Sequence, residues 1–240
     1  MKVFRAVTLV ALLASCSAQL AHACSVSSDY RVPNNLELTE KAQAIIIGRV
    51  ERAHAGTSLL DNGLEIQLVR TLKGEALPPT ITLTGLSLAE DRFLVLSNPY
   101  ELREAHPLAY IGGCARFMFP LGTMALFFLK RDEKGDWGPA AYPFSRWAED
   151  VPGIDAPWVR LTDIYIHAES LTGPERNAFL IAERDRLKAK GDDPVSLLMA
   201  ADIDRQLKGP NRPWNDIMMD QMKAMGFGDP EKHSKKKHGE

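Results

Sequence analysis

Two kinds of apolar pattern mark strands in the first part of the chain. Residues 64–68 and 80–84 alternate apolar and polar side chains, which is typical of antiparallel strands with one buried face. Residues 44–50 are a β-branched, apolar run that predicts a strand, and residues 124–129 are a continuous apolar run that favours a strand buried on both faces. Gly48, inside the first run, predicts a bulge or a sharp bend. Since the first three strands follow one another closely, we expect a meander.

Weaker patterns surround these strands. We predict an irregular stretch at 24–38, one helical turn at 39–42, a short strand at 91–96, and a long loop at 98–111. Residues 137–142 are expected to form a return strand after a turn at Lys134-Gly135-Asp136. Pro139 places this strand at a sheet edge, because proline lacks the N–H that a central strand needs.

The pattern becomes helical after a proline-rich boundary at 144–158. Thr172 is expected to cap a helix that extends to about Lys190. Asp193, followed by proline, caps a second helix, and a third short helix follows Pro213.

Strands followed by helices predict an α+β fold: an N-terminal antiparallel β-barrel, small and closed and of the OB type, followed by a C-terminal helical segment. The predicted organisation is a signal peptide at 1–23, the barrel at 24–143, a linker and helical segment at 144–228, and a disordered basic tail at 229–240.

The N-terminus has the features of an export signal. Lys2 and Arg5 precede the short apolar stretch 6–14, which is too short to span a bilayer. Two cleavage sites compete. Ala21-His22-Ala23 suits cleavage before Cys24, whereas Leu13-Ala14-Ser15 resembles a lipobox that would place a lipid on Cys16. We therefore expect a periplasmic or secreted protein or, as the alternative, an outer-membrane lipoprotein that meets the membrane only through its lipid anchor.

Three cysteines are present, and Cys16 is removed or lipidated under either cleavage. Cys24 and Cys114 then remain as a pair in an oxidising compartment, which favours a disulfide. Such a bridge would close a loop of roughly 90 residues and stabilise the fold by about 4–5 kcal/mol in the chain-entropy model. The alternative is two free buried thiols.

Composition and motifs narrow the function classes. At a net charge of −2 the basic residues are not in excess, so the charge gives no indication of nucleic-acid binding. No hydrolase, P-loop, zinc-protease or dinucleotide motif occurs, so we expect neither an enzyme nor a cofactor. His54, His106, Cys114 and His167 match no metal-ligand spacing, and no metal site of the chain's own is expected. Asp61 and Glu65 suit a solvated turn better than a catalytic pair.

Two C-terminal features suit contact surfaces. Trp214 and the methionines 218, 219, 222 and 225 favour either a helix packed on its own domain or an adaptable partner surface. The lysines 235–237, flanked by His233 and His238, are expected to solubilise the tail, with anionic lipid or weak metal binding as the alternative.

The order of several elements resembles the netrin-like module, the OB-type barrel of the tissue inhibitors of metalloproteinases and their bacterial relatives. The resemblance covers about residues 24–142. The matching features are Cys24-Ser25, the segment 42–50, the strand ending at Leu72-Lys73-Gly74, Cys114, and the run ending at Phe127-Phe128-Leu129.

In that family the α-amino group and carbonyl of the N-terminal cysteine chelate the zinc of the protease, and the next small residue enters the substrate pocket. The resemblance implies these roles for Cys24 and Ser25, with the bridge to Cys114 holding them rigid. Val26 stands where the inhibitors carry a second cysteine. The expected partner is a protein, either a zinc protease or another secreted or periplasmic hydrolase. The alternative is a lipoprotein, anchored through Cys16, that presents the loops 52–63 and 98–111 to an envelope partner.

Overall fold

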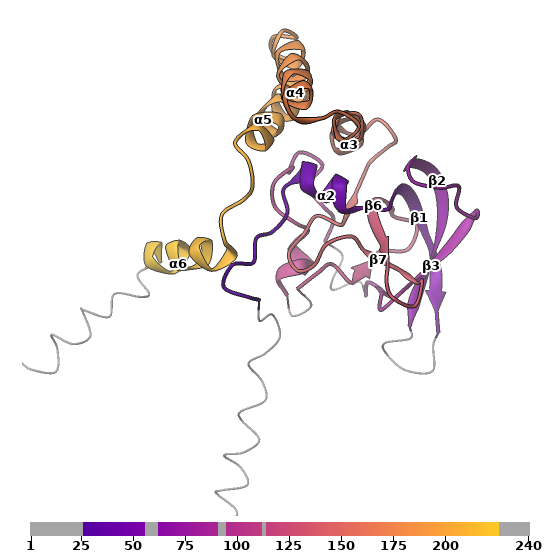
Figure 1. Cartoon of the computed structure of the whole chain (residues 1–240). Helices are drawn as coiled ribbons and strands as arrows, with labels where there is room; N and C mark the ends of the chain where they lie inside the picture. The colour runs from indigo at the N-terminus through magenta and orange to yellow at the C-terminus, as the bar shows by residue number, and fades with distance from the viewer. Residues whose placement is uncertain (1–25, 56–61, 91–94, 112–113, 226–240) are drawn as a thin grey trace, which may run out of the picture.

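A computed structural model describes residues 26–55, 62–90, 95–111 and 114–225, and its centre is a curled antiparallel sheet (Figure 1). The hydrogen-bonded order is β3-β2-β1-β6-β7, and β8 also pairs with β6. The sheet strands are β1 (Ala44–His54), β2 (Gly63–Lys73), β3 (Thr80–Thr84), β6 (Met124–Arg131), β7 (Trp137–Pro139) and β8 (Ala148–Asp150). Two short strands, β4 (Ser87–Leu88) and β5 (Met118–Phe119), pair in parallel beside it.

The topology of the sheet is a Greek key. The strands β1, β2 and β3 form the expected meander, and β6 returns after a long connection to lie beside β1. The register of β1 against β2 shifts between Ile47 and Gly48, which confirms the predicted bulge. Pro139 ends β7 at the edge of the sheet, also as predicted.

The central strands β1 and β6 are both buried on two faces, which the apolar run of β6 predicts. Successive side chains of a strand point to opposite faces. Ile46 and Phe127 belong to a cluster inside the curl of the sheet. Ile45 and Phe128 belong to a second cluster, which joins the outer face of the sheet to the helices.

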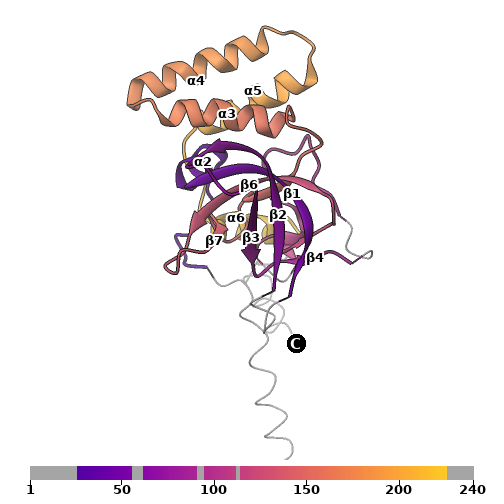
Figure 2. The same cartoon turned by 90° about the vertical axis from the view of Figure 1, so that its right-hand side faces the viewer.

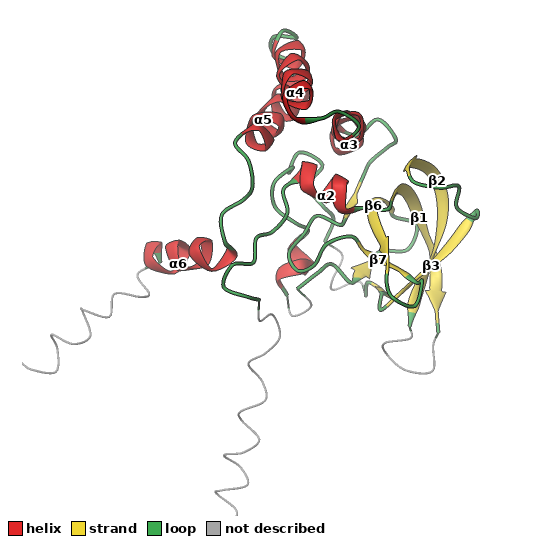
Figure 3. Ribbon diagram, in the orientation of Figure 1, coloured by secondary structure: helices red, strands yellow, loops and turns green. Residues whose placement is uncertain are grey.

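Helices cover that outer face. They are α2 (Asn35–Lys41), α3 (Pro157–Glu169), α4 (Gly173–Lys188) and α5 (Pro194–Leu207), and all four contribute to the outer cluster. Figures 1 and 2 show α3, α4 and α5 gathered on one side of the sheet. The last helix, α6 (Trp214–Ala224), lies apart from them (Figure 3). Among the described residues, no helix is both long and apolar enough to cross a membrane.

The segment Leu72-Lys73-Gly74 joins the sheet to this helical cover. The Lys73 ammonium donates to the Thr39 carbonyl at 2.8 Å and forms an ion pair with Glu169 at 2.7 Å. Gly74 has a φ of +101°, and a Cβ there would lie 2.5 Å from the Gln43 carbonyl oxygen. Lysine and glycine at these two positions are therefore explained by packing.

The three predicted C-terminal helices are confirmed as α4, α5 and α6. The Asp193 side chain caps α5 by accepting from the Ser196 N–H. Thr172 precedes α4 as expected, but its side chain makes no capping hydrogen bond.

Several local predictions were wrong. The stretch 24–38 is not irregular throughout, because α2 begins at Asn35 behind a capping box of Asn34 and Glu37. The boundary at 144–158 contains β8 and the first two residues of α3, so the sheet takes a strand from beyond residue 143. A 3₁₀ turn, η3 (Pro107–Tyr110), lies within the predicted loop 98–111.

The predicted barrel is confirmed as a curled antiparallel sheet followed by helices, but the described strands do not close it. β3 and β7 stand at the two ends of the hydrogen-bonded order. Of the predicted strand 91–96, residues 95 and 96 are not in a strand, and residues 91–94 lie outside the described residues. The predicted signal at 1–23 and tail at 229–240 also lie outside them.

Gly48 permits the close approach of β2 to β1. A Cβ at Gly48 would lie 2.3 Å from Cγ2 of Ile66, a buried side chain of the inner cluster. We predict that Gly48→Ala lowers the free energy of unfolding by about 1–3 kcal/mol, because the added methyl overpacks the core. Urea denaturation measures this change.

Gly138 offers a matched control within the same sheet, since a Cβ there would meet no atom within 4 Å. We expect Gly138→Ala to change the free energy of unfolding by less than about 0.5 kcal/mol. Equal effects of the two substitutions would contradict this account of Gly48.

Candidate functional site

Cys114 is the one predicted site residue that the structure describes. Cys16, Cys24 and Ser25 lie outside the described residues, so the Cys24–Cys114 bridge stays a prediction. Cys114 is 1% exposed and has a φ of +57°. Its carbonyl oxygen accepts a hydrogen bond from the Phe144 N–H at 2.6 Å, and Phe144 itself has a φ of +56°. Two non-glycine residues with left-handed backbone conformations are thus joined by a backbone hydrogen bond.

An aromatic stack gathers four segments beside Cys114. The Phe144 ring stacks on Tyr110 with 5.7 Å between centroids and on Trp214 with 4.3 Å. The backbone N–H of Trp214 donates to the Tyr30 carbonyl at 2.8 Å, and the Tyr30 hydroxyl donates to the Pro143 carbonyl at 2.5 Å. The start of the described chain, η3, the segment 142–144 and α6 therefore meet at one place.

Apolar side chains near this stack are open to solvent. The exposed fractions are 41% for Tyr110, 58% for Ile111 and 56% for Tyr142. We call these three residues the Cys114 surface. The helix α6, which begins at Trp214, has no buried residue and exposes Met219, Met222 and Met225. An apolar surface with adaptable methionines beside it is typical of a contact area for another protein.

A buried polar cluster fastens the segments 95–111 and 114–118 to β8. The Ser97 hydroxyl donates to Glu149 at 2.6 Å, and the Glu149 carboxylate also accepts from the His106 backbone N–H at 2.9 Å. The Arg116 guanidinium pairs with Asp150 at 2.8 Å. Burial raises the pKa of Glu149 above its ordinary value.

His106 is not placed as a catalytic base. Its Nδ1 accepts from the Leu108 N–H at 3.1 Å, and its Nε2 lies 2.8 Å from the Val95 carbonyl oxygen. Since Nδ1 faces a donor, the proton of the neutral ring belongs on Nε2, where it donates to Val95. Burial, and then the positive charge of Arg116, lower the pKa of His106 to about 4. The cluster therefore holds the loop in place, and Ser97 and His106 are not paired for catalysis.

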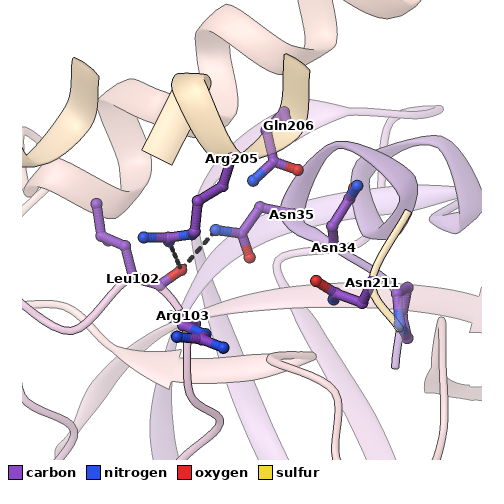
Figure 4. A pocket seen from close by; sticks show the side chains of 8 residues that line it. Asn34, Asn35, Leu102, Arg103, Arg205, Gln206 and Asn211 are labelled. Carbon is purple, nitrogen blue, oxygen red and sulfur yellow. Dashed lines mark hydrogen bonds between the residues drawn. The ribbon is translucent and has the colours of Figure 1, made fainter. Parts of the chain in front are cut away.

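A second buried cluster joins α2, the loop at Leu102 and α5. The Asp202 carboxylate accepts from the Tyr165 hydroxyl at 2.5 Å, from the Asn35 amide at 3.1 Å and from Arg205. Asn35 and Arg205 both donate to the Leu102 carbonyl, at 2.7 and 3.0 Å (Figure 4). Burial raises the pKa of Asp202, and Arg205, Tyr165 and Asn35 oppose that shift.

The pocket beside this cluster is small. Its volume is about 30 Å³, close to the share of one water molecule in the liquid. It is lined by polar groups, among them Asn34, Arg103 and Asn211 (Figure 4). The pocket suits a bridging water and is too small for a substrate.

The residues considered as metal ligands lie in separate places. His54 ends β1, His106 precedes η3, and His167 is on α3, where its ring contacts Phe179. Within the described ranges, no three histidine, cysteine or acidic side chains are grouped as a metal site would need. Glu65 forms an ion pair with Arg52 at 2.6 Å, and Asp61 lies outside the described residues.

The aromatic stack is the part of the site that sequence reasoning missed. The sequence drew attention to Trp214 through the methionines that follow it, but nothing in it linked Trp214 to Phe144 or Tyr110. The available signal was aromatic: Tyr110 and Phe117 flank Cys114, and Tyr142 and Phe144 flank Pro143.

Comparisons with protein-family models, with curated proteins and with solved structures found no match to this chain. The site must therefore be interpreted from its own residues.

The Asp202 cluster predicts a contrast between two aspartates of α5. Asp202→Ala leaves Arg205, Tyr165 and Asn35 without their shared acceptor, so we expect the free energy of unfolding to fall by about 3 kcal/mol. Asp204 pairs at the surface with Arg184 and Lys188. Asp204→Ala should therefore cost less than about 1 kcal/mol. Denaturant titration of both variants measures the contrast, and similar losses would refute it.

The buried imidazole of His106 predicts a pH dependence of stability. Its pKa of about 4 in the folded chain lies below the ordinary value of 6.5. As the pH falls below 6.5, the unfolded chain takes up this proton and the folded chain does not, so stability is lost between about pH 6.5 and 4. The loss has a limiting slope of about 1.4 kcal/mol per pH unit.

His106→Gln should remove this part of the dependence, which unfolding at a series of pH values measures. Glu149, Asp150 and Arg116 face His106 in both proteins, so comparing each variant with the parent isolates the histidine. His54→Gln, at the exposed end of β1, controls for the loss of an imidazole elsewhere. A parent and a His106→Gln protein with parallel pH profiles would disprove the prediction.

Proposed function

We propose that this chain is an exported, non-enzymatic protein that binds another protein through its N-terminal residues Cys24 and Ser25 together with the Cys114 surface. The observation that carries the proposal is the exposure of Tyr110, Ile111 and Tyr142, which lie close in the sequence to the buried Cys114 or to its hydrogen-bond partner Phe144. Exposed aromatic and aliphatic side chains are what a partner buries at the centre of an interface.

The strand arrangement supports an OB-type, netrin-like barrel as the scaffold. The spatial order β6-β1-β2-β3 is that of a Greek key, and β7 extends the sheet on the far side of β6. A partly open, curled Greek-key sheet of five main strands is what the OB fold requires. The long connection between β3 and β6 contains Cys114, which the proposal pairs with the N-terminus.

The position of Tyr30 supports the proposed bridge between Cys24 and Cys114. The Tyr30 hydroxyl is hydrogen-bonded to the Pro143 carbonyl. Phe144, which follows Pro143, is hydrogen-bonded to Cys114 through its backbone N–H. Cys24 precedes Tyr30 by six residues, which span at most about 20 Å when extended. The N-terminal segment is therefore long enough to bring Cys24 to Cys114.

The inhibitor mechanism follows if the mature chain begins at Cys24. The bridge would hold the α-amino nitrogen and the carbonyl oxygen of Cys24 as a rigid bidentate ligand for the zinc of a protease. Ser25 would enter the substrate pocket, and the Cys114 surface would contact the rim of the active-site cleft. The preorganised ligand loses little conformational entropy on binding.

The alternative is an outer-membrane lipoprotein. The lipobox before Cys16 directly adjoins the apolar stretch of the signal, which favours this processing. Cys24 would then carry no free amine and could not chelate zinc, and the Cys114 surface would serve an envelope partner.

The first experiment is the intact mass of the protein recovered from medium and envelope fractions of its host. We expect a chain that begins at Cys24 and lacks two hydrogen atoms, as one disulfide requires. A chain that begins at a lipidated Cys16 would exclude chelation and support the lipoprotein alternative.

Inhibition assays against a panel of secreted zinc endopeptidases then test the mechanism. The chain that begins at Cys24 should inhibit at least one of them, and one alanine added before Cys24 should abolish inhibition by removing the chelating amine. The extended protein keeps the Cys114 surface, so it is the matched control. Equal inhibition by both proteins, or inhibition by neither, would reject the inhibitor function.

A further inference from the structure

Half of the methionines of the chain lie on or directly after the helix α6. The chain has eight, and the four in question are Met218, Met219, Met222 and Met225, which we call the α6 methionines. Met219, Met222 and Met225 are 48%, 40% and 63% exposed, and Met218 is half-buried. Since α6 has no buried residue, the core of the protein does not account for this cluster.

Helical spacing gathers the α6 methionines around Met222. Met218 and Met219 precede it by four and three residues, and Met225 follows it by three. Residues three or four apart are neighbours on a helix surface, with Cβ atoms about 5–6 Å apart. The helical geometry extends to Met225, because its backbone N–H donates to the Gln221 carbonyl at 3.0 Å. Met222 is therefore the common neighbour of the other three.

The helix is anchored at one end, and its methionine side chains are adaptable. The Trp214 ring stacks on Phe144 with 4.3 Å between centroids, which fixes the first residue of α6 to the rest of the fold. A methionine side chain is unbranched and has three rotatable bonds, so the sulfurs of neighbouring methionines can turn toward one ion.

The ligand atoms select a soft, monovalent ion. Thioether sulfur is neutral and soft, and it favours Cu(I) over hard cations. The positions three and four residues from Met222 carry no carboxylate that would neutralise a divalent ion. Asp220 is two residues away and pairs with Arg212 at 3.0 Å. The absence of a metal-ligand spacing among the histidines and Cys114 does not bear on methionine sulfur.

We propose that the α6 methionines bind Cu(I), or the chemically similar Ag(I), through the sulfur of Met222 and those of at least two of its three neighbours. Every set of three adjoining sulfurs includes Met222, which is therefore the shared ligand. The site uses neither Cys24 and Ser25 nor the Cys114 surface. The proposed protein-binding function and this metal site can therefore fail separately.

The first probe is silver nitrate, because Ag(I) is stable in air and shares the preference of Cu(I) for sulfur. The full chain is labelled with ¹³C at the methionine methyl groups, and its free thiols are blocked with N-ethylmaleimide so that cysteines do not compete. Single Met→Leu variants assign the signals. We expect saturable shifts of the Met222 methyl and of at least two neighbours. The signals of Met118, Met124 and Met199, which lie in β5, β6 and α5, should not move.

Met222→Leu keeps an apolar side chain of similar volume and removes only the shared sulfur. The affinity for Cu(I), measured under nitrogen by competition with bathocuproine disulfonate, should fall at least tenfold. Met218 and Met219 would remain, but adjacent residues do not face each other on a helix. Met225→Leu leaves Met222 with two neighbours and should reduce the affinity less. Both variants should fold, because α6 has no buried residue.

The histidines of the C-terminal tail are the competing ligands. The double variant His233→Gln and His238→Gln is the matched control and should keep the affinity of the parent. Thioethers hold no proton in this range, so the affinity should be equal at about pH 5 and pH 7. A histidine site would weaken at the lower pH, because its ligands take up protons.

Three results would each overturn the proposal: no saturable shift of the Met222 methyl signal, unchanged Cu(I) affinity in the Met222→Leu protein, or an affinity that is lost in the double histidine variant or at the lower pH.

Discussion

The fold depends on the burial of two neighbouring strands, β1 and β6, on both faces. Their continuous apolar runs supply the inner cluster through Ile46 and Phe127 and the outer cluster through Ile45 and Phe128. A curled sheet can bury its inner face by itself, but its outer face needs a second layer. The helices α2 to α5 provide that layer, so the C-terminal helices complete the core that the strands begin. This is also why the outer cluster draws residues from both sides of the boundary expected at 143.

Apolar packing alone does not fix how the second layer is oriented, because the hydrophobic effect is not directional. Buried polar contacts supply the direction. Asp202 joins α5 to α2 and α3 through Asn35 and Tyr165, and Lys73 ties the ends of α2 and α3 to β2. Glu149 and Asp150 do the same for the loop that contains Ser97, His106 and Arg116. Each such group would be costly to bury without its partners, so the arrangement that satisfies them all is strongly selected.

The features that could be predicted from the sequence are those that local pattern determines. Alternation located β2 and β3, apolar runs located β1 and β6, and Asp193 followed by proline located α5. The helix α2 was predicted only as one turn at 39–42 after an irregular stretch, although Asn34 and Glu37 have the spacing of a capping box. The strand β8 was missed because two of its three residues are acids, whose partners lie far away along the chain. For the same reason Cys114 could be singled out, but its hydrogen bond to Phe144, and the stacking of Phe144 on Trp214, could not be predicted.

The position of Cys114 is itself an argument for function. Cys114 and Phe144 both have left-handed φ angles, which cost side-chain-bearing residues energy, and each supports the other through one backbone hydrogen bond. Such conformations persist only where the surroundings enforce them. Here the enforcement comes from the aromatic stack with Tyr110 and Trp214, yet Tyr110 and the adjacent Ile111 remain open to solvent. The partner that we propose would cover these exposed side chains, while the buried Cys114 and Phe144 hold the backbone beside them in place.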